Sequence, residues 1–266
     1  MIETIPDKPL PLTVEQAETM ANRMIKKHHV AIVLLHWFNA LTWLLELVTG
    51  VGLIVAPALK IAPEWYLAVV GGVFDGRANV LRFHIAVGMV WIVVFAVYGI
   101  FGWRHYLKAE VLRNEIGLDK DDIDWLRLRI LLILGRTKKS LPPQGSYNAG
   151  QKMYALLVYA AIPVIMLTGL IMTFHWFGTF VVGWAMVLHF TAVGMVVSGL
   201  MVHVYMGAVF PEEKPAFYSM ITGMVNELYA YRHHFKWWRE VKQNELAWKE
   251  QLRAHESELV AKQCGN

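Results

Sequence analysis

Four long runs of apolar residues alternate with polar segments along the chain, at approximately Val30–Val55, Phe83–Gly102, Met153–Phe174 and Phe180–Phe210. Each run is long enough to form a helix that crosses the hydrocarbon core of a bilayer, which requires about 20 apolar residues. The first and fourth runs exceed that length, so we expect these helices to tilt or to project beyond the membrane. The pattern predicts four transmembrane helices.

The polar segments predict further helices outside the membrane. Segment Asp121–Arg136 begins with acidic residues, continues with arginines and is too short to span a bilayer, which favours a helix at the membrane interface. A helix packed against other cytoplasmic segments fits equally well. The tail Met224–Lys262 carries tryptophans among charges and predicts an amphipathic helix. No repeat of fixed period is evident, and the first apolar run is too long for the core of a signal peptide.

These elements together predict an all-α fold, an integral membrane four-helix bundle with an interfacial cytoplasmic helix and a helical cytoplasmic tail. The expected parts are an N-terminal segment at 1–29, a transmembrane domain at 30–210 with a loop at 103–152, and a tail at 211–266. Of the 25 Lys and Arg residues, all but the three between the first two spans lie in the N-terminal segment, the long loop or the tail. Because basic loops stay in the cytoplasm, both termini and the long loop are predicted on the cytoplasmic side of the membrane.

The composition limits which cofactors and activities are possible for this chain. Hydrophobic residues make up 56% of the chain and charged residues only 17%, and the basic residues flank apolar runs, which argues against nucleic-acid binding. The single cysteine, Cys264, excludes disulfide scaffolds, Cys-ligated iron–sulfur clusters and thioether-attached haem. No nucleotide-binding or hydrolase motif is present, so no substrate-level catalytic centre is predicted. Any redox group must be held by histidine or carboxylate.

Four of the eleven histidines lie inside the predicted spans, where ionisable residues mark functional sites by default. Two of them, His189 and His203, are 14 residues apart in the fourth span. At about 100° and 1.5 Å per residue, both project from nearly the same face, about 21 Å apart along the axis. The direction of each span then places His84 at the depth of His189, and His36 at the depth of His203.

We call His84 and His189 the outer pair and His36 and His203 the inner pair. Histidine pairs that bridge antiparallel helices are the axial ligands that two non-covalently bound b-type haems require. In the alternative interpretation, each histidine only forms a hydrogen bond to a neighbouring helix. The histidines in charged segments are expected to be solvated or to lie near lipid headgroups; these are His28, His29, His233, His234 and His255.

Two small features accompany these histidines. Gly88 and Gly199 lie four residues from His84 and His203, where a missing side chain would let a porphyrin approach the helix. Before the third span, Asn148 and Gln151 fit a capping box. The same amides, with Gly150 between them, would also suit a slot in which a quinone carbonyl accepts hydrogen bonds at the depth of the inner pair.

These residues also carry a resemblance to a known family. The matching motifs are His36-Trp37, His84, Tyr147-Asn148-Ala149-Gly150-Gln151-Lys152, His189, His203-Val204-Tyr205-Met206, and Ser219–Gly223 through His233-His234 and Trp237. Over roughly Lys27–Val241 the chain resembles the cytochrome b (gamma) subunit of respiratory formate dehydrogenases, within the wider family of di-haem quinone-linked membrane cytochromes b. The chain departs from that family in a longer N-terminal extension and a longer loop between the second and third spans.

The resemblance implies a function in anaerobic respiration. In that family, four transmembrane helices bind two b haems and pass electrons from a periplasmic iron–sulfur subunit, fed by a molybdenum or tungsten catalytic subunit, to menaquinone near the cytoplasm. Carried over, the outer and inner pairs each hold one haem, and Asn148 and Gly150 lie at the quinone pocket. Thiosulfate reductase and hydrogenase partners stay open, as does a higher oligomer of the complex.

Two other functions compete with electron transfer. A metal or proton transporter would use the same histidines together with Glu46, which lies ten residues after His36 in the first span. A single carboxylate supports a pathway weakly, and a hydrogen bond to a neighbouring helix is the favoured role of Glu46. The third function is a bare membrane anchor whose histidines bind nothing.

Overall fold

The computed structural model describes residues 5–6, 8–55, 57, 60–102 and 115–264, the last seven by their backbone alone. Apart from one short two-stranded sheet, the regular structure of this part of the chain is helical, which confirms the predicted all-α class. The chain divides into two compact units. We call residues 28–112 and 154–210 the transmembrane unit, and residues 1–27, 113–153 and 211–266 the polar unit.

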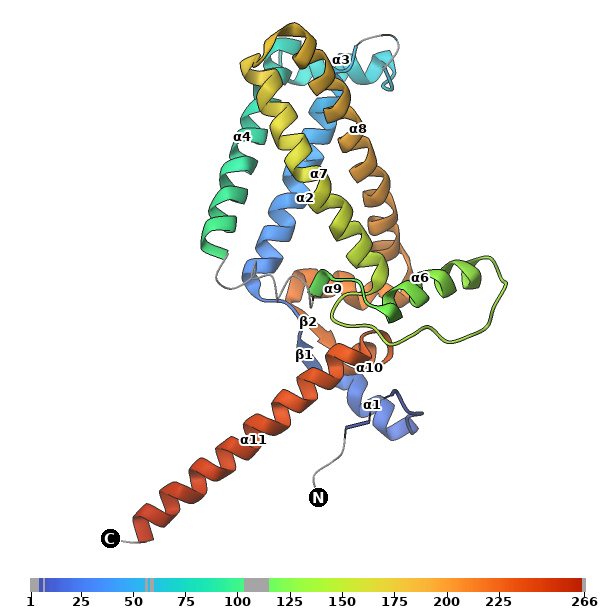
Figure 1. The fold of residues 1–266 in the computed structure, drawn as a ribbon, viewed down its shortest axis with the longest axis vertical. Helices are drawn as coiled ribbons and strands as arrows, with labels where there is room; N and C mark the ends of the chain where they lie inside the picture. Colours follow the sequence, from blue (N-terminus) through green and yellow to red (C-terminus); the bar gives the residue numbers. More distant parts are fainter. Residues whose placement is uncertain (1–4, 7, 56, 58–59, 103–114, 265–266) are drawn as a thin grey trace. The chain divides into compact units, whose positions relative to one another are not determined.

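Four helices are long and apolar enough to cross a membrane, as predicted (Figure 1). They are α2 (Val30–Leu53), α4 (Arg77–Gly102), α7 (Ala149–Phe174) and α8 (Gly178–Val204). A π-helical turn, η1 (Tyr205–Val209), extends α8 almost to the predicted end of the fourth span. Helix α4 begins six residues before the predicted span, because Arg77–Arg82 continue the helical backbone although three of them are polar.

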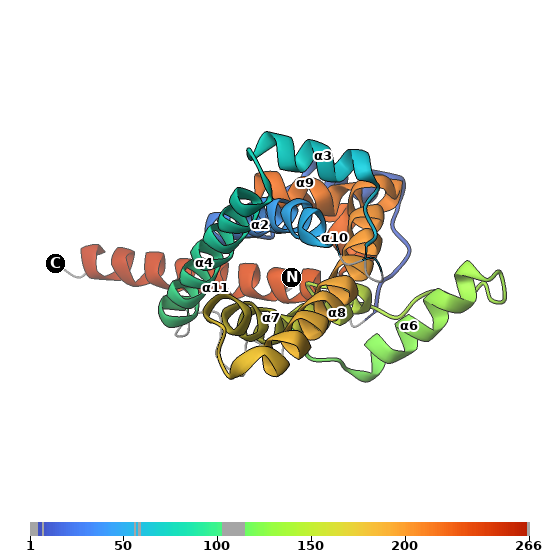
Figure 2. The same cartoon turned by 90° about the horizontal axis from the view of Figure 1, so that it is seen from above.

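Within the transmembrane unit the helices pack as antiparallel hairpins. Helix α2 packs on α4, where the indole Nε1 of Trp91 donates a hydrogen bond of 2.8 Å to Asn39 Oδ1. Helix α7 meets α8 where the ring of Tyr154 covers Gly199, at which a Cβ atom would lie only 2.7 Å from Tyr154 Cδ2. Seen from above, α2 and α4 lie next to each other, as do α7 and α8 (Figure 2).

A further helix, α3 (Glu64–Val73), lies between α2 and α4 in sequence and contacts both. It packs closely on α2, because a Cβ atom at Gly52 would lie 2.8 Å from Val70 Cγ1. This helix was not predicted: its ten residues are too few to span a bilayer, and apart from Glu64 at its start they carry no charge that would mark a polar face.

The polar unit contains the one sheet of the described residues. Strand β1 (Met24–Lys26) pairs antiparallel with β2 (Met224–Asn226), with Ile25 opposite Val225. The surrounding elements are α1 (Val14–Asn22), η2 (Pro211–Glu213), α9 (Lys214–Thr222), α10 (Glu227–His233) and α11 (Phe235–Cys264). The predicted single tail helix at Met224–Lys262 is therefore wrong at its start, which is a strand followed by two helices.

The predicted loop helix is present as α6 (Lys120–Ile133). Its N-terminus is closed by a capping box in which the Asp119 carboxylate accepts from the Asp122 backbone N–H and the Asp122 carboxylate accepts from that of Asp119. Asp122 is buried and forms an ion pair with Lys152, so the first turn of α6 is packed on protein. Residues 103–114 of the predicted loop lie outside the described residues.

Candidate haem sites

The imidazole of His84, on α4, is held by two side chains of α2. Its Nδ1 lies 2.9 Å from Thr49 Oγ1 and 2.7 Å from Glu46 Oε2. Thr49 is fully buried, and its hydroxyl donates to the backbone carbonyl of Leu45 at 2.7 Å, which fixes the position of the oxygen. The structure thus gives Glu46 the hydrogen-bonding role toward a neighbouring helix that the sequence favours for it.

The imidazole of His189, on α8, is held in the same way by α7. Its Nδ1 lies 3.0 Å from Thr168 Oγ1 and 3.1 Å from the backbone carbonyl oxygen of Ile165. The Thr168 hydroxyl donates to the Val164 carbonyl at 2.6 Å. The two members of the outer pair, His84 and His189, are close enough for an electrostatic interaction between their rings.

The two hairpins therefore repeat one local arrangement, a Thr-Gly dipeptide that faces a histidine of the following helix. A Cβ atom at Gly50 would lie 3.2 Å from His84 Cε1, and one at Gly169 would lie 3.6 Å from His189 Cε1. Sequence reasoning missed Thr49 and Thr168, although the recurrence of Thr-Gly in two apolar spans was a usable signal. The separation of the two threonines differs from that of the two histidines, so the repeat has no fixed period.

These contacts decide which nitrogen of each outer histidine is available to a metal. A hydrogen bond from Nδ1–H to an oxygen acceptor fixes the neutral tautomer in which Nε2 carries the free lone pair. Glu46 and Thr49 provide such acceptors for His84, and Ile165 and Thr168 provide them for His189. The donor set of the outer pair fits two axial imidazoles, each oriented by its neighbours.

The inner pair is brought together directly. The ring centres of His36, on α2, and His203, on α8, lie 6.4 Å apart with an interplanar angle of 56°. Metal–imidazole bonds are about 2.0 Å long, so two rings on opposite sides of one metal have centres roughly 6 Å apart. The spacing of the inner pair fits a shared iron. Tyr154 stacks on His203 at 5.1 Å, and Trp37 meets the edge of His36 at 5.6 Å.

Among the described residues, no group of three or more His, Cys, Asp or Glu side chains converges on a common point. A haem iron takes four ligands from the porphyrin and needs only two from the protein. Pairs of histidines therefore meet its requirement.

Of the two glycines that were expected to admit a porphyrin, Gly199 differs from that expectation. The space beside Gly199 is occupied by the ring of Tyr154 and is not open. At Gly88, a Cβ atom would be in ordinary contact with Glu46 Oε1, at 3.6 Å. Helix packing explains the need for a small residue at Gly199. The glycines that lie against histidine rings are Gly50 and Gly169.

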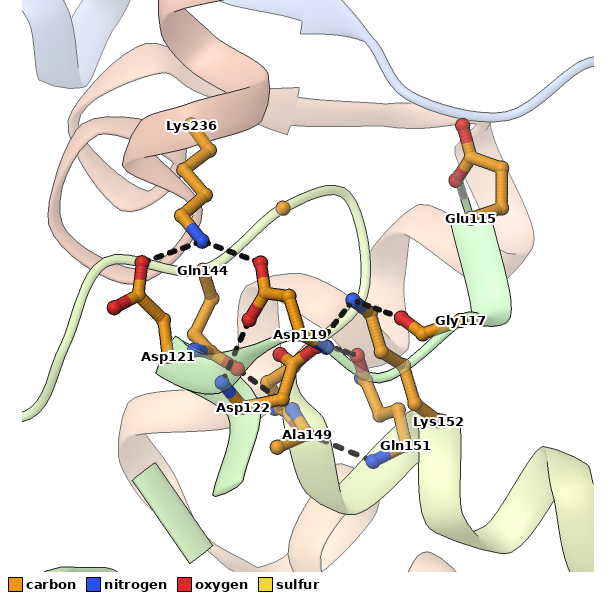
Figure 3. Close-up of polar contacts among 12 residues, drawn as sticks. Glu115, Gly117, Asp119, Asp121, Asp122, Gln144, Ala149, Gln151, Lys152 and Lys236 are labelled. Atoms are coloured by element: carbon orange, nitrogen blue, oxygen red, sulfur yellow. Dashed lines mark hydrogen bonds and ion pairs between the residues drawn. The ribbon is translucent and has the colours of Figure 1, made fainter. Parts of the chain in front are cut away.

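The turn before α7 forms the predicted capping box. The Asn148 Oδ1 accepts from the Gln151 backbone N–H at 2.9 Å, and the Gln151 Oε1 accepts from that of Asn148 at 3.0 Å. The next backbone N–H, of Ala149, donates to Gln144 Oε1 at 2.7 Å (Figure 3). At Gly150, a Cβ atom would lie 3.3 Å from Asn148 Oδ1 and 3.8 Å from the indole of Trp125, so this face of the turn is covered by α6.

Two lysines connect the start of α6 to its neighbours, Lys152 from α7 and Lys236 from α11, as Figure 3 shows. The Lys152 ammonium lies 2.7 Å from Asp122 Oδ2 and donates to the Gly117 carbonyl at 3.1 Å, with both charged side chains buried. Lys236 bridges Asp119 and Asp121, each at 2.7 Å. Partial burial opposes the charged form of Asp119 and is the largest single effect, but the hydrogen bonds from Lys236 and the Asp122 backbone N–H and the charges of Lys236 and Lys152 together outweigh it and lower the pKa of that carboxyl. Removing either Lys152 or Asp122 would leave the other charge buried without a partner, which is strongly destabilising.

The expectation that the remaining histidines are solvated is wrong for two of them. His234 is completely buried and His28 nearly so. The Nδ1–H of His234 donates to the Gly145 carbonyl at 2.7 Å, and its Nε2 lies 3.2 Å from the Lys27 ammonium. Burial lowers the pKa of Lys27 to about 8, against the opposing effect of Glu213. Charged segments indicate exposure in a sequence, and the cluster that joins Ile25 of β1 to Tyr229 and Ala230 of α10 has no signal there.

Four apolar helices that hold histidines against their neighbours are typical of a membrane cytochrome of b type. The chain belongs to the prokaryotic cytochrome b561 family, whose model matches residues 27–223. Membership implies haem b as the cofactor and, with the four apolar helices, an integral membrane protein.

Curated relatives agree with the resemblance seen in the sequence. The chain is 24% identical over 231 residues to the formate dehydrogenase cytochrome b556 subunit of Haemophilus influenzae, which covers 85% of this chain and 87% of the relative. It is 27% identical over 213 residues to the formate dehydrogenase cytochrome b556(fdo) subunit of Escherichia coli K12, with 78% and 88% covered. It is 32% identical to the nitrate-inducible cytochrome b556(Fdn) subunit of the same strain, over 131 residues that cover 48% and 58%.

Proposed function

We propose that this chain binds two b-type haems and passes electrons between a partner dehydrogenase and the membrane quinone pool. His84 and His189 hold one haem, and His36 and His203 hold the other. The observation that carries the proposal is the occurrence of two separate histidine pairs in one apolar unit, one with ring centres 6.4 Å apart and one with both Nδ1 atoms held by acceptors. The haems supply one-electron transfer.

The residues of the chain position these ligands. Thr49 and Glu46 orient His84, and Thr168 orients His189, so that each Nε2 is available without a change of tautomer. In the inner pair, the Tyr154 ring restricts the rotation of the His203 ring on which it stacks. Ligands held in this way need little rearrangement when the charge of the metal changes.

We place the quinone-binding residues in the turn Asn148–Gln151 on the cytoplasmic side. The capping box uses the side-chain oxygens of Asn148 and Gln151, which leaves each amide NH₂ as a donor for a quinone carbonyl. Gly150 keeps this part of the turn small. The turn leads into α7, whose residue Tyr154, four positions after Gly150, stacks on His203. Protons for the reduced quinone would come from cytoplasmic water.

The partner is proposed from the names of the relatives, which are all cytochrome b556 subunits of formate dehydrogenases. From the family resemblance of the sequence we further propose that the chain anchors a periplasmic iron–sulfur subunit and a molybdenum or tungsten catalytic subunit to the inner membrane, with menaquinone as the acceptor. The same names favour formate dehydrogenase over a thiosulfate reductase or a hydrogenase as the partner complex.

Visible spectroscopy of the detergent-purified chain tests the function. After reduction with dithionite we expect sharp b-haem absorption bands, and addition of a menaquinone analogue should return the spectrum to the oxidised form. A colourless protein would contradict the proposal and leave an anchor or a transporter. Haem bands that do not respond to any quinone would contradict the quinone step alone.

A further inference from the structure

The two members of the outer pair are held by different chemistry, although the arrangement around them is repeated. Thr49 and Thr168 occupy matching places beside Nδ1 of His84 and His189. Three residues before each threonine stands the second acceptor of that histidine. It is the carboxylate of Glu46 in one hairpin and the backbone carbonyl of Ile165 in the other. The outer pair therefore has one ligand with an anionic acceptor and one with a neutral acceptor.

The position of the Glu46 carboxylate within a transmembrane helix costs free energy. It lies in the apolar helix α2, its side chain is 23% exposed, and Oε2 approaches His84 Nδ1 to 2.7 Å. Its other oxygen, Oε1, is buried and has no hydrogen-bond partner among the described residues. Ionisable groups within the membrane are expensive and are kept where they serve a function. The partner that the structure gives this carboxylate is the ring nitrogen of His84.

A carboxylate acceptor changes the electronic character of an imidazole ligand. The negative charge draws the Nδ1 proton toward itself and raises the basicity of Nε2, so the ligand donates more electron density to the metal. An electron-rich ligand and a nearby negative charge both favour the oxidised metal. Addition of one electron, in which no bond forms or breaks and no proton is needed, therefore becomes less favourable at that site.

We propose that Glu46 is a positioning residue that acts through His84 and lowers the reduction potential of the haem held by the outer pair. This inference rests on the proposed function. Ile165, the counterpart of Glu46 in the second hairpin, has no charge to offer His189, so the effect comes from one ligand alone. The inner pair, whose described contacts are aromatic, serves as an internal reference in the same molecule.

Redox titration followed by visible absorption tests the role of Glu46. In Glu46→Gln, which keeps the shape of the side chain and removes its charge, one haem component should shift toward reduction by about tenfold in its equilibrium constant. For a one-electron couple this corresponds to a rise of about 59 mV. The second component should stay in place. Thr42→Val is the matched control, because Thr42 is also buried on α2 but its hydroxyl donates to the backbone carbonyl of Phe38, so no shift in either component is expected.

Glu46→Asp separates the contact from the charge. The shorter side chain keeps the carboxylate in the helix but withdraws it from His84 Nδ1. If Glu46 acts through its hydrogen bond, the potential of the Asp variant rises toward that of the Gln variant. A potential equal to that of the wild type would contradict the positioning role and leave only a through-space charge. If the Gln variant loses the haem, the Asp variant alone tests the role of Glu46, and a wild-type potential in that variant would contradict it.

The outcomes for the two proposals can be told apart. Wild-type protein without haem would contradict the proposed function itself. Wild-type protein with two haems, together with unchanged potentials in both Glu46 variants, would contradict the role of Glu46 and leave the proposed function standing.

Discussion

At the scale of single residues, the four transmembrane histidines differ in what surrounds them. His84 and His189 each present Nδ1 to oxygen acceptors on the preceding helix. The rings of His36 and His203 instead face each other and lie against Trp37 and Tyr154. Polar acceptors orient the outer pair and aromatic packing orients the inner pair, so substitutions around the two pairs should have different effects.

The proposed quinone turn is tested with Asn148→Ala and Gly150→Leu. The alanine removes a helix cap at a cost of about 1 kcal/mol, which a packed bundle should survive, and it also removes a donor to the quinone. The leucine introduces bulk against Asn148 Oδ1 and Trp125. Both variants should keep two haems that dithionite reduces, yet reoxidation by an added menaquinone analogue should slow by at least about tenfold, which corresponds to an increase of about 1.4 kcal/mol in the barrier.

Thr13→Ala provides the matched control for the cap. Thr13 and Gln16 form the same reciprocal capping box at the start of α1, so this variant loses an equivalent cap outside the proposed site. Its reoxidation rate should equal that of the wild type. Normal reoxidation in both Asn148→Ala and Gly150→Leu would place the quinone elsewhere and leave the turn as a helix cap.

At the scale of elements, the apolar runs predicted the four spans well because bilayer thickness imposes a length that few other helices reach. The capping box at Asn148 was equally readable, since it depends on residues three apart in sequence. The pairing of Ile25 with Val225 was not, because three-residue strands have no periodicity to detect and their partners are 200 positions apart. The Glu46–His84 contact joins two helices and needed their relative rotation, which sequence does not supply.

The packing of β1 against the tail makes Lys27 a titrating element of the fold. Burial lowers its pKa from 10.5 to about 8. Between these values the unfolded chain holds a proton that the folded chain has lost, so this residue should make stability rise with pH from about 8 toward 10.5. In Lys27→Met, the melting temperature followed by tryptophan fluorescence should rise less over that window than in the wild type.

Lys26→Met is the control for this effect. Lys26, the last residue of β1, directly precedes Lys27 and is exposed, so its loss should leave the pH dependence of the melting temperature unchanged. Equal slopes for the wild type and Lys27→Met would show that the Lys27 ammonium is not held in a desolvated site.

At the scale of the whole molecule, the distribution of basic residues predicts the orientation on which the names of the two histidine pairs depend. Reporter fusions after Lys262 should be active only as cytoplasmic reporters, and a tag inserted near Gly178, in the turn between α7 and α8, should be accessible from outside the cell. Periplasmic activity of the C-terminal fusion would reverse the topology and exchange the outer and inner pairs.

The central claim is that four named histidines form two independent haem sites, and the haem content per chain of single-histidine variants tests it most directly. The wild type should contain two haems. His84→Ala and His189→Ala should each remove the same one, and His36→Ala and His203→Ala should each remove the other, because each pair shares one iron. Pyridine haemochrome absorption against protein concentration gives the count. Two haems retained after substitution in both pairs, or loss of both haems from every variant that still folds, would contradict the claim.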